Sequence, residues 1–243
     1  LHRLIRRQRQ MCIRDRVIVV NTPNNPTGAV MNKKSLEAIV EVAGEHDLLV
    51  LSDEVDWPLT YEGVKHLSPA LLKDGRERTV VVESFSKVFG LTGWRVGYAY
   101  GPVEIIDSME KVQEHVVSGP ATFVQKACVK VLEEAEEYVR WVVKECEKRR
   151  NLVLKELNTV PGLKTPKPAG GFYVYPDFSS YGLKSDKLAK ELLEEEGVLV
   201  TPGFMFGKEG MYRARICYAV PEEELVEGLR RIEKFFKRLE PRR

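Results

Sequence analysis

Short apolar runs alternate with polar or glycine-containing turns and with helical patterns along this chain. The strand-like runs occupy residues 17–20, 48–51, 79–82 and 95–100. Continuous apolar runs without strict alternation are typical of strands covered on both faces, as in a mostly parallel sheet. Asn32 precedes the first helical pattern and is expected to cap a helix that ends near Glu45. The first half of the chain therefore predicts an α/β fold.

The second half of the chain has a different pattern. Residues 120–157 predict one long, charged helix, and a second helix is expected at 185–196. "GVLVTPG" and "YRARICYA" are expected strands, and a last amphipathic helix begins near Pro221. Its expected core face consists of Leu225, Leu229, Ile232, Phe236 and Leu239. We predict a larger domain at residues 17–150, ending in a long interdomain helix, and a smaller α+β domain at 151–243.

Composition limits the class of protein. Apolar residues make up 43% of the chain and charged residues 30%, as in ordinary globular proteins. No apolar run is long enough to span a membrane. The cysteines at 12, 128, 146 and 217 are scattered, without a CxxC pair or a ligand spacing to histidine. We therefore expect reduced thiols, a cytoplasmic protein, and no metal site.

Residues 1–16 carry six arginines and one aspartate. The rest of the chain has 32 basic and 35 acidic residues, so the net charge of +2 depends on this segment. A nucleic-acid arm or a transit peptide is one interpretation, but the segment lacks serine and joins an apolar strand without a linker. "RQRQMCIRDR" resembles a spurious run found in gene predictions. We interpret residues 1–16 as a non-native extension and expect neither nucleic-acid nor membrane partners.

Three polar residues each follow a strand-like run: Asn25, Asp53 and Lys87. In open α/β sheets, ligands bind at the carboxyl ends of the strands. Each residue alone is compatible with a turn, a helix cap or a solvated side chain. Together they fit a Schiff-base cofactor, because a lysine amine forms an imine with an aldehyde and a carboxylate keeps a pyridine nitrogen protonated.

Hydroxyl and guanidinium groups surround this lysine in "SFSKVFGLTGWRVGY". Ser84, Ser86 and Arg95 are candidate ligands for a phosphate. With "NTPNNPTG", "SDEV", "PAGGFYVYP" and "RARICYA", this segment resembles the pyridoxal-phosphate-dependent aminotransferases of class I/II, the aspartate-aminotransferase-like group of fold type I. The resemblance runs from Val17 to the C-terminus. It implies part of a cofactor-binding large domain followed by the small domain.

The resemblance also implies roles for single residues. Lys87 would form the imine and then move a proton between the substrate and the cofactor. Asp53 would pair with the pyridine nitrogen of pyridoxal 5'-phosphate, and Asn25 would contact the ring oxygen and the substrate. Ser84 and Arg95 would bind the phosphate.

The substrate is expected to bind through an arginine of the last predicted strand. Arg215, followed by "ICYA", matches the arginine that binds the substrate α-carboxylate, with Arg213 as the alternative. The expected partners are an amino acid and a 2-oxo acid, and the family usually forms homodimers.

The chain departs from the family pattern in two ways. Asp56 stands where the family commonly has a tyrosine that donates to the ring oxygen, and an ionised aspartate cannot donate. Three explanations are open: Asp56 turns away from the ring oxygen, Asp56 carries a proton, or the cofactor is tuned differently. Our hypothesis is that the pKa of the imine is raised relative to family members that have the tyrosine. Family members also have a further N-terminal region with a glycine-rich phosphate loop. We expect this chain to be the C-terminal two-thirds of an aminotransferase, with uncertain activity of its own.

Other functions stay open at this point. Carbon–sulfur β-lyases and aminocyclopropane-carboxylate-synthase-like enzymes of the same fold use similar residues. A non-catalytic fragment that acts as a binding or assembly partner is a further possibility. Ser84-x-x-Lys87 also fits the SxxK nucleophile of β-lactamase-like enzymes, but the accompanying S-D-N and K-T-G elements do not occur.

Overall fold

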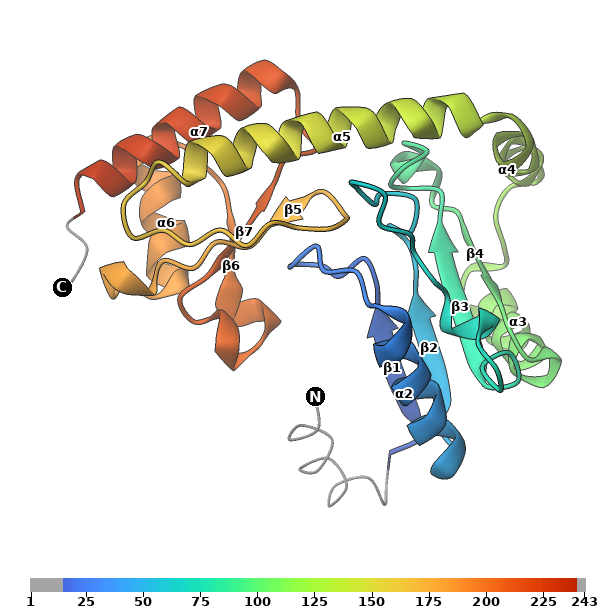
Figure 1. The fold of residues 1–243 in the computed structure, drawn as a ribbon. Helices are drawn as coiled ribbons and strands as arrows, with labels where there is room; N and C mark the ends of the chain where they lie inside the picture. The colour runs from blue at the N-terminus through green and yellow to red at the C-terminus, as the bar shows by residue number, and fades with distance from the viewer. Residues whose placement is uncertain (1–14, 240–243) are drawn as a thin grey trace. The chain divides into compact units, whose positions relative to one another are not determined.

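The computed structural model describes residues 15–239, which form two compact units (Figure 1). The first unit comprises residues 15–22, Met31–Asp56 and Lys65–Glu136, and the second comprises Pro23–Val30, Trp57–Val64 and residues 137–239. Two short segments, one after each of the first two strands, thus belong to the second unit. The domain boundary predicted at residue 150 stays a prediction.

A four-stranded sheet in the order β1-β2-β3-β4 forms the centre of the first unit. The strands are β1 (Val17–Asn21), β2 (Leu49–Asp53), β3 (Thr79–Ser84) and β4 (Gly97–Tyr100). The first three are parallel, and β4 pairs antiparallel with β3. The predicted α/β class with a mostly parallel sheet is confirmed.

Helix α2 (Lys33–Glu45) covers one face of this sheet (Figure 1). The Asn32 side chain accepts a hydrogen bond from the Ser35 amide at 2.9 Å, so the predicted cap is present. The core beneath the helix consists of Val20, Leu36, Ala43, Leu48 and Val50. Burial of these side chains provides most of the stabilisation, because helix propensity alone contributes little.

Two helices follow the sheet in the first unit, α3 (Val103–Val117) and α4 (Thr122–Glu134). Helix α3 was not predicted, and none of its residues is buried. The single helix predicted at 120–157 is wrong, because α4 ends before Ala135 and α5 (Glu136–Leu157) begins after it. Ala135 leaves helical geometry at φ −85° and ψ 11°. No glycine or proline stands at this break, and nothing in the local sequence explains it.

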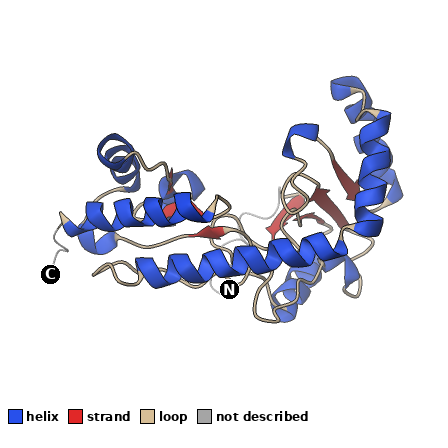
Figure 2. Cartoon of the chain, turned by 90° about the horizontal axis from the view of Figure 1, so that it is seen from above, coloured by secondary structure: helices blue, strands red, loops and turns tan. Residues whose placement is uncertain are grey.

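The second unit combines long helices with a small antiparallel sheet in the order β5-β7-β6 (Figure 2). After α5 its elements are β5 (Tyr173–Val174), α6 (Ser185–Glu196), β6 (Thr201–Pro202), β7 (Ala214–Cys217) and α7 (Glu222–Lys237). The helices at 185–196 and after Pro221 agree with the sequence patterns. The predicted core residues Leu225, Leu229, Ile232 and Phe236 are buried on α7, whereas Leu239 lies beyond the end of this helix and is half-buried.

Short 3₁₀ helices connect the longer elements. They are η2 (Pro69–Leu71), η3 (Thr92–Trp94), η4 (Ser179–Tyr181), η5 (Gly203–Phe206) and η6 (Lys208–Gly210). Among residues 15–239, no helix combines the length and the apolar character needed to cross a membrane.

Arg150 is the largest fully buried side chain, with 1% of its surface exposed. Its guanidinium donates to the Pro168 carbonyl at 3.2 Å and pairs with Glu62 at 3.1 Å. It also lies 4.7 Å from the centre of the Tyr61 ring. These contacts join α5 to the segments around residues 62 and 168 within the second unit. A buried charge is stable only when it is paired in this way.

We expect Arg150→Ala to destabilise the protein by about 3 kcal/mol, because it removes buried packing and leaves the Pro168 carbonyl without a donor. Lys155→Ala is the matched control on the same helix, since the Lys155 side chain is 79% exposed and pairs at 3.7 Å with the neighbouring Glu156. Its expected cost is below about 1 kcal/mol. Urea unfolding followed by circular dichroism measures both. Equal losses would contradict the assignment of Arg150 as a structural anchor.

Candidate functional site

Asp53 and Lys87 follow neighbouring parallel strands of the first unit. Asp53 is the last residue of β2 and pairs in register with Val82 of β3. Lys87 lies in the turn after β3, which ends at Ser84. Because the carboxyl ends of parallel strands meet at one edge of a sheet, both side chains belong to the same edge.

Hydrogen bonds fix the backbone around Asp53. Its carbonyl accepts from the Thr22 amide at 3.2 Å, and the next residue, Glu54, donates its amide to the Val82 carbonyl at 3.0 Å. One carboxylate oxygen of Asp53 accepts from the Val55 amide at 3.3 Å. The half-buried carboxylate is therefore oriented before any ligand binds.

Asp56 is 3% exposed and is near enough to Asp53 and Lys87 to interact with them electrostatically. Burial raises the pKa of its carboxyl from 3.8 to about 6, while the nearby Lys87 lowers this pKa and Asp53 raises it. Its Oδ1 atom has no hydrogen-bond partner among residues 15–239. The side chain does not lie in solvent, and the three options that the sequence left open for Asp56 stay open.

Ser84, Ser86 and Arg95 are joined by one chain of hydrogen bonds. The Ser86 amide donates to the Ser84 hydroxyl at 3.0 Å, and the Ser86 carbonyl accepts from the Thr92 hydroxyl at 2.6 Å. Arg95 in turn donates to the Thr92 carbonyl at 2.9 Å. The three predicted phosphate ligands therefore lie on one loop. Thr92, which the sequence analysis did not single out, connects Ser86 to Arg95.

Arg95 has a left-handed backbone conformation, with φ 52° and ψ 50°. A residue other than glycine pays about 1–2 kcal/mol for this conformation. Such strained residues cluster at functional sites, where the surrounding structure holds them. The fold therefore holds the exposed Arg95 guanidinium in position, and the strained backbone lowers the stability of the folded protein.

A buried polar network follows directly after Asp53. Glu54 is 3% exposed and accepts hydrogen bonds from Ser52 at 2.8 Å and Ser68 at 2.6 Å. Its other oxygen lies 2.6 Å from His66 Nε2. This network ties the end of β2 to the segment that returns to the first unit at residues 65–68. Sequence reasoning assigned no role to Glu54, because a charged residue after a strand looks solvent-exposed.

Asn25 and Arg215 belong to the second unit. An Arg215 nitrogen donates to Asn25 Oδ1 at 2.9 Å, and another donates to the Thr201 hydroxyl at 3.1 Å. The guanidinium carbon lies 4.5 Å from the centre of the Tyr173 ring and 5.3 Å from the centre of the Phe206 ring. Within residues 15–239 it pairs with no carboxylate, and its buried Nε has no hydrogen-bond partner. This geometry is suited to binding a carboxylate in a bidentate manner.

Arg213, the alternative arginine, already has a carboxylate partner. It pairs with Asp177 at 3.1 Å. Burial raises the pKa of Asp177, but hydrogen bonds from Ser179 and then the charges of Arg213 and Lys164 outweigh it, so this pKa lies below its ordinary value. Arg213 is therefore less suited than Arg215 to an added carboxylate.

The loop that carries Asn25 is held by a close backbone approach at Gly28. The amides of Ala169 and Gly170 both donate to the Gly28 carbonyl at 2.9 Å. Gly28 has φ 65°, and a side chain there would meet Pro168 Cβ at 2.3 Å. Only glycine fits this position, which explains the glycine of "NTPNNPTG".

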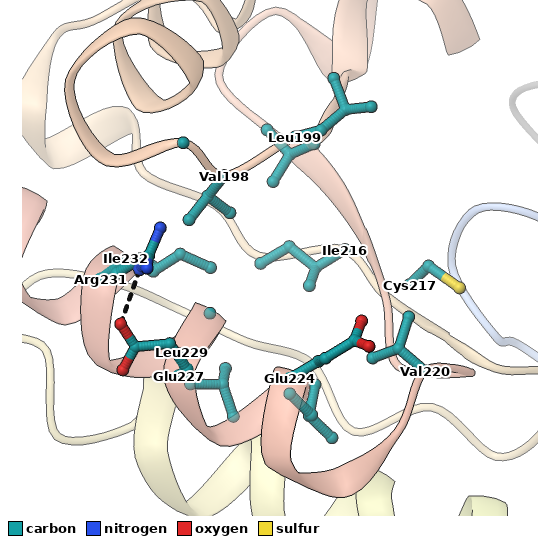
Figure 3. A pocket seen from close by; sticks show the side chains of 14 residues that line it. Val198, Leu199, Ile216, Cys217, Val220, Glu224, Glu227, Leu229, Arg231 and Ile232 are labelled. Atoms are coloured by element: carbon teal, nitrogen blue, oxygen red, sulfur yellow. Dashed lines mark hydrogen bonds and ion pairs between the residues drawn. The ribbon is translucent and has the colours of Figure 1, made fainter.

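Two cavities lie in the second unit. One, of about 460 Å³, is lined by Asn25 and Phe206, which both contact Arg215, and by Arg213 and Glu209. The other, of about 450 Å³, lies between α7, β7 and residues 197–200, with mainly apolar walls (Figure 3). It contains none of the predicted site residues.

Comparison with known proteins identifies the family. The profile described as "Aminotransferase class I and II" matches residues 1–232. This chain belongs to the class I and II aminotransferase family, so the resemblance seen in the motifs is confirmed.

Individual relatives agree with this assignment. Aromatic-amino-acid aminotransferase 2 of Thermococcus litoralis is 43% identical over 224 residues, which are 91% of this chain and 57% of that protein. The aspartate aminotransferase of Pyrococcus horikoshii is 41% identical over 90% of this chain and 56% of its own length. This chain therefore spans less than three fifths of the length of these relatives.

Solved structures confirm the fold type. The aromatic aminotransferase of Pyrococcus horikoshii OT3 superposes with a TM-score of 0.87 at 43% identity, over 92% of this chain and 60% of that one. A double mutant of Thermus thermophilus aspartate aminotransferase gives a TM-score of 0.87 at 39% identity, over 95% and 59%. The expected fold type I is confirmed, and the roles predicted for single site residues stay predictions.

We expect Asp56→Asn to stabilise the protein at neutral pH. Because the folded pKa of Asp56 exceeds 3.8, the wild-type protein gains stability from protonation below pH 3.8 and loses it as pH rises through about 6. The variant does not titrate, so its advantage should grow over this range to about 3 kcal/mol at most.

Urea unfolding between about pH 4 and pH 8 measures this difference. Asp74→Asn is the matched control, since Asp74 is exposed in a turn of the same unit. It should change stability by less than about 0.5 kcal/mol at every pH. If the difference in unfolding free energy between the wild type and Asp56→Asn does not change with pH, the Asp56 carboxyl of the folded wild type is not protonated at mildly acidic pH.

Proposed function

We propose that this chain carries lysine-based chemistry for transferring an amino group between an α-amino acid and a 2-oxo acid, with pyridoxal 5'-phosphate as cofactor. The observation that carries the proposal is the placement of Asp53 and Lys87 at the ends of adjacent parallel strands. The membership of the chain in the aminotransferase family supports the same function.

The side chains of the first unit fit this cofactor. When bound, pyridoxal phosphate supplies an aldehyde and an electron-withdrawing pyridine ring. The primary amine of Lys87 would bind the aldehyde, and the oriented carboxylate of Asp53 would keep a proton on the ring nitrogen. The hydroxyls of Ser84 and Ser86 and the Arg95 guanidinium would hold the phosphate on their shared loop. Lys87 would also accept and return the proton from the substrate Cα.

The second unit would supply the substrate carboxylate site. Arg215 has two donors oriented by Asn25 and Thr201, and two aromatic rings lie close to its guanidinium. A guanidinium fixed in this way binds a carboxylate with little further loss of side-chain entropy. Asn25 is proposed as a further substrate contact, because it accepts a hydrogen bond from Arg215.

The whole protein is proposed to act as a homodimer, as is usual for the family. Val117 and Phe123 expose 57% and 65% of their surfaces, which supports a contact in the region 117–125. A cytoplasmic location is also proposed, on the basis of the family and of the scattered cysteines.

Lys87 is expected to be the residue that reacts with the cofactor. The purified chain is incubated with pyridoxal phosphate, reduced with borohydride, and analysed by peptide mass spectrometry. Lys87 should carry the adduct, Lys87→Ala should lose it, and the exposed control Lys73→Ala should retain it. An adduct spread equally over surface lysines would contradict the proposal. Acceptor-independent formation of pyruvate and ammonia would instead indicate a β-lyase.

Arg215→Ala is expected to weaken binding of 2-oxoglutarate about 10- to 100-fold, because a bidentate charged contact is lost. Calorimetry on the chain loaded with pyridoxal phosphate measures the dissociation constant. Arg213→Ala is the matched comparison on the same strand region and should lower stability while binding changes less than about twofold. The opposite result would assign the carboxylate to Arg213.

A further inference from the structure

Glu54 is a buried carboxylate to which the chemistry above gives no role. Its side chain is 3% exposed and has three polar partners. The hydroxyls of Ser52 and Ser68 donate to one of its oxygens at 2.8 Å and 2.6 Å, and His66 Nε2 lies 2.6 Å from the other oxygen. A buried charge requires such partners, yet well-packed apolar side chains in place of a buried charged group often give a protein that is no less stable. Stability alone therefore does not explain an acid at this position.

The neighbour that Glu54 can influence is Asp53, the carboxylate proposed to meet the ring nitrogen of the cofactor. Side chains alternate along a strand, so Ser52 and Glu54 lie on one face of the sheet and Asp53 lies on the other. The Glu54 amide donates to the Val82 carbonyl at 3.0 Å, and one Asp53 oxygen accepts from the Val55 amide at 3.3 Å. The peptide unit that joins Glu54 to Val55 carries this second amide. Contacts that fix Glu54 therefore also fix the donor that orients Asp53.

The partners of Glu54 lie on two different parts of the first unit. Ser52 belongs to β2, whereas His66 and Ser68 belong to the connection from β2 to β3. The His66 side chain is 8% exposed, and the Ser68 hydroxyl also accepts from the Ala70 amide at the start of η2, at 3.3 Å. Glu54 is thus held between a strand and an ordered turn. Loss of these contacts would loosen the chain just after Asp53 while the pairing of β2 with its neighbouring strands remains.

We propose that Glu54, held by Ser52, His66 and Ser68, is a positioning residue that keeps the Asp53 carboxylate oriented for the ring nitrogen of pyridoxal phosphate. This role rests on the proposed function, in which Asp53 meets that nitrogen. Glu54 does not touch the cofactor, because its side chain lies on the opposite face of the sheet and acts through the backbone of residues 53–55.

This role has a spectroscopic consequence. A carboxylate close to the ring nitrogen favours the protonated, positively charged form of that nitrogen. When Asp53 is no longer held in place, the ring nitrogen keeps its proton less well. The nitrogen that Lys87 contributes to the adduct is then protonated more easily, because a nearby positive charge is lost. The pH midpoint of the absorption band of the adduct should therefore rise.

The experiment compares the full chain with Glu54→Ala, Glu54→Gln, His66→Ala and the control Val40→Ala. Val40 is a buried core residue of α2, so its truncation lowers stability without touching the Glu54 contacts. Absorption titrations with pyridoxal phosphate give the dissociation constant and the pH midpoint of the band. Borohydride trapping with mass spectrometry locates the adduct on Lys87, and urea unfolding measures the stability of each variant.

Glu54→Ala should bind pyridoxal phosphate about tenfold more weakly than wild type, and its midpoint should rise by about one pH unit. His66→Ala should change both quantities in the same direction by a smaller amount, because two hydroxyl partners remain. Glu54→Gln keeps an acceptor for both serines and should restore most of the affinity. Val40→Ala should lose stability but keep the wild-type midpoint.

If the adduct forms on Lys87 but Glu54→Ala and His66→Ala keep the wild-type midpoint, Glu54 is only structural and the inference fails. The same conclusion follows if Val40→Ala shifts the midpoint as much as they do. If Glu54→Ala does not fold, His66→Ala decides the question. If the wild type forms no adduct on Lys87, the proposed function fails as well, and mass spectrometry separates that outcome from the others.

Discussion

The parallel pairing of β2 with β3 is the constraint on which the site depends. It places Asp53 and Lys87 at one edge although a long segment of chain separates them. Parallel neighbouring strands are joined by a crossover connection. Here the connection from β2 to β3 contains the short helix η2 and residues 57–64, which belong to the second unit, instead of a long helix. The hydrogen bonds of Glu54 connect this crossover, at His66 and Ser68, to the end of β2. Ser52, His66 and Ser68 together pair both carboxylate oxygens of Glu54, so the loss of any one of them would weaken the pairing of a buried charge.

The contrast between paired and unpaired charges is the basis for proposing Arg215, and not Arg213, as the residue that binds a substrate carboxylate. Arg150 is buried and surrounded by partners, and Arg213 is paired with Asp177. Arg215 is held by neutral oxygens and aromatic rings, without a carboxylate among the described residues. Proteins leave charged groups without an oppositely charged partner where a ligand later supplies that partner, and the free protein is less stable as a result.

Much of the fold could be predicted from the sequence, because the strands and most helices follow local patterns. The apolar runs, the Asn32 cap and the spacing on α7 each depend on neighbours a few residues away. Helix α3 does have apolar residues at helical spacing, at positions 103, 106, 109, 112 and 116, which the sequence analysis overlooked, although none of them is buried. The break at Ala135 has no local signal at all, which is why α4 and α5 were predicted as one helix.

The site was predictable only in part, for a related physical reason. Side chains that follow strands, such as Asp53 and Lys87, can be placed on one edge by the rules of parallel sheets. The burial of Asp56 and the contacts of Glu54 depend on how the segment after β2 folds back, which no periodicity encodes. Thr92 was missed because a threonine in a polar turn carries no distinguishing signal, although it connects Ser86 to Arg95.

The close approach at Gly28 has a consequence for how this protein can change by mutation. Any side chain at this position would collide with Pro168, and the carbonyl of Gly28 is shared by two amides of the facing loop. A larger residue or an insertion in the loop at residues 25–28 or in the loop at residues 168–170 would therefore require a change in the other loop at the same time. Laboratory evolution aimed at new substrates would therefore need to randomise residues 25–28 and 168–170 together, as a single combinatorial block.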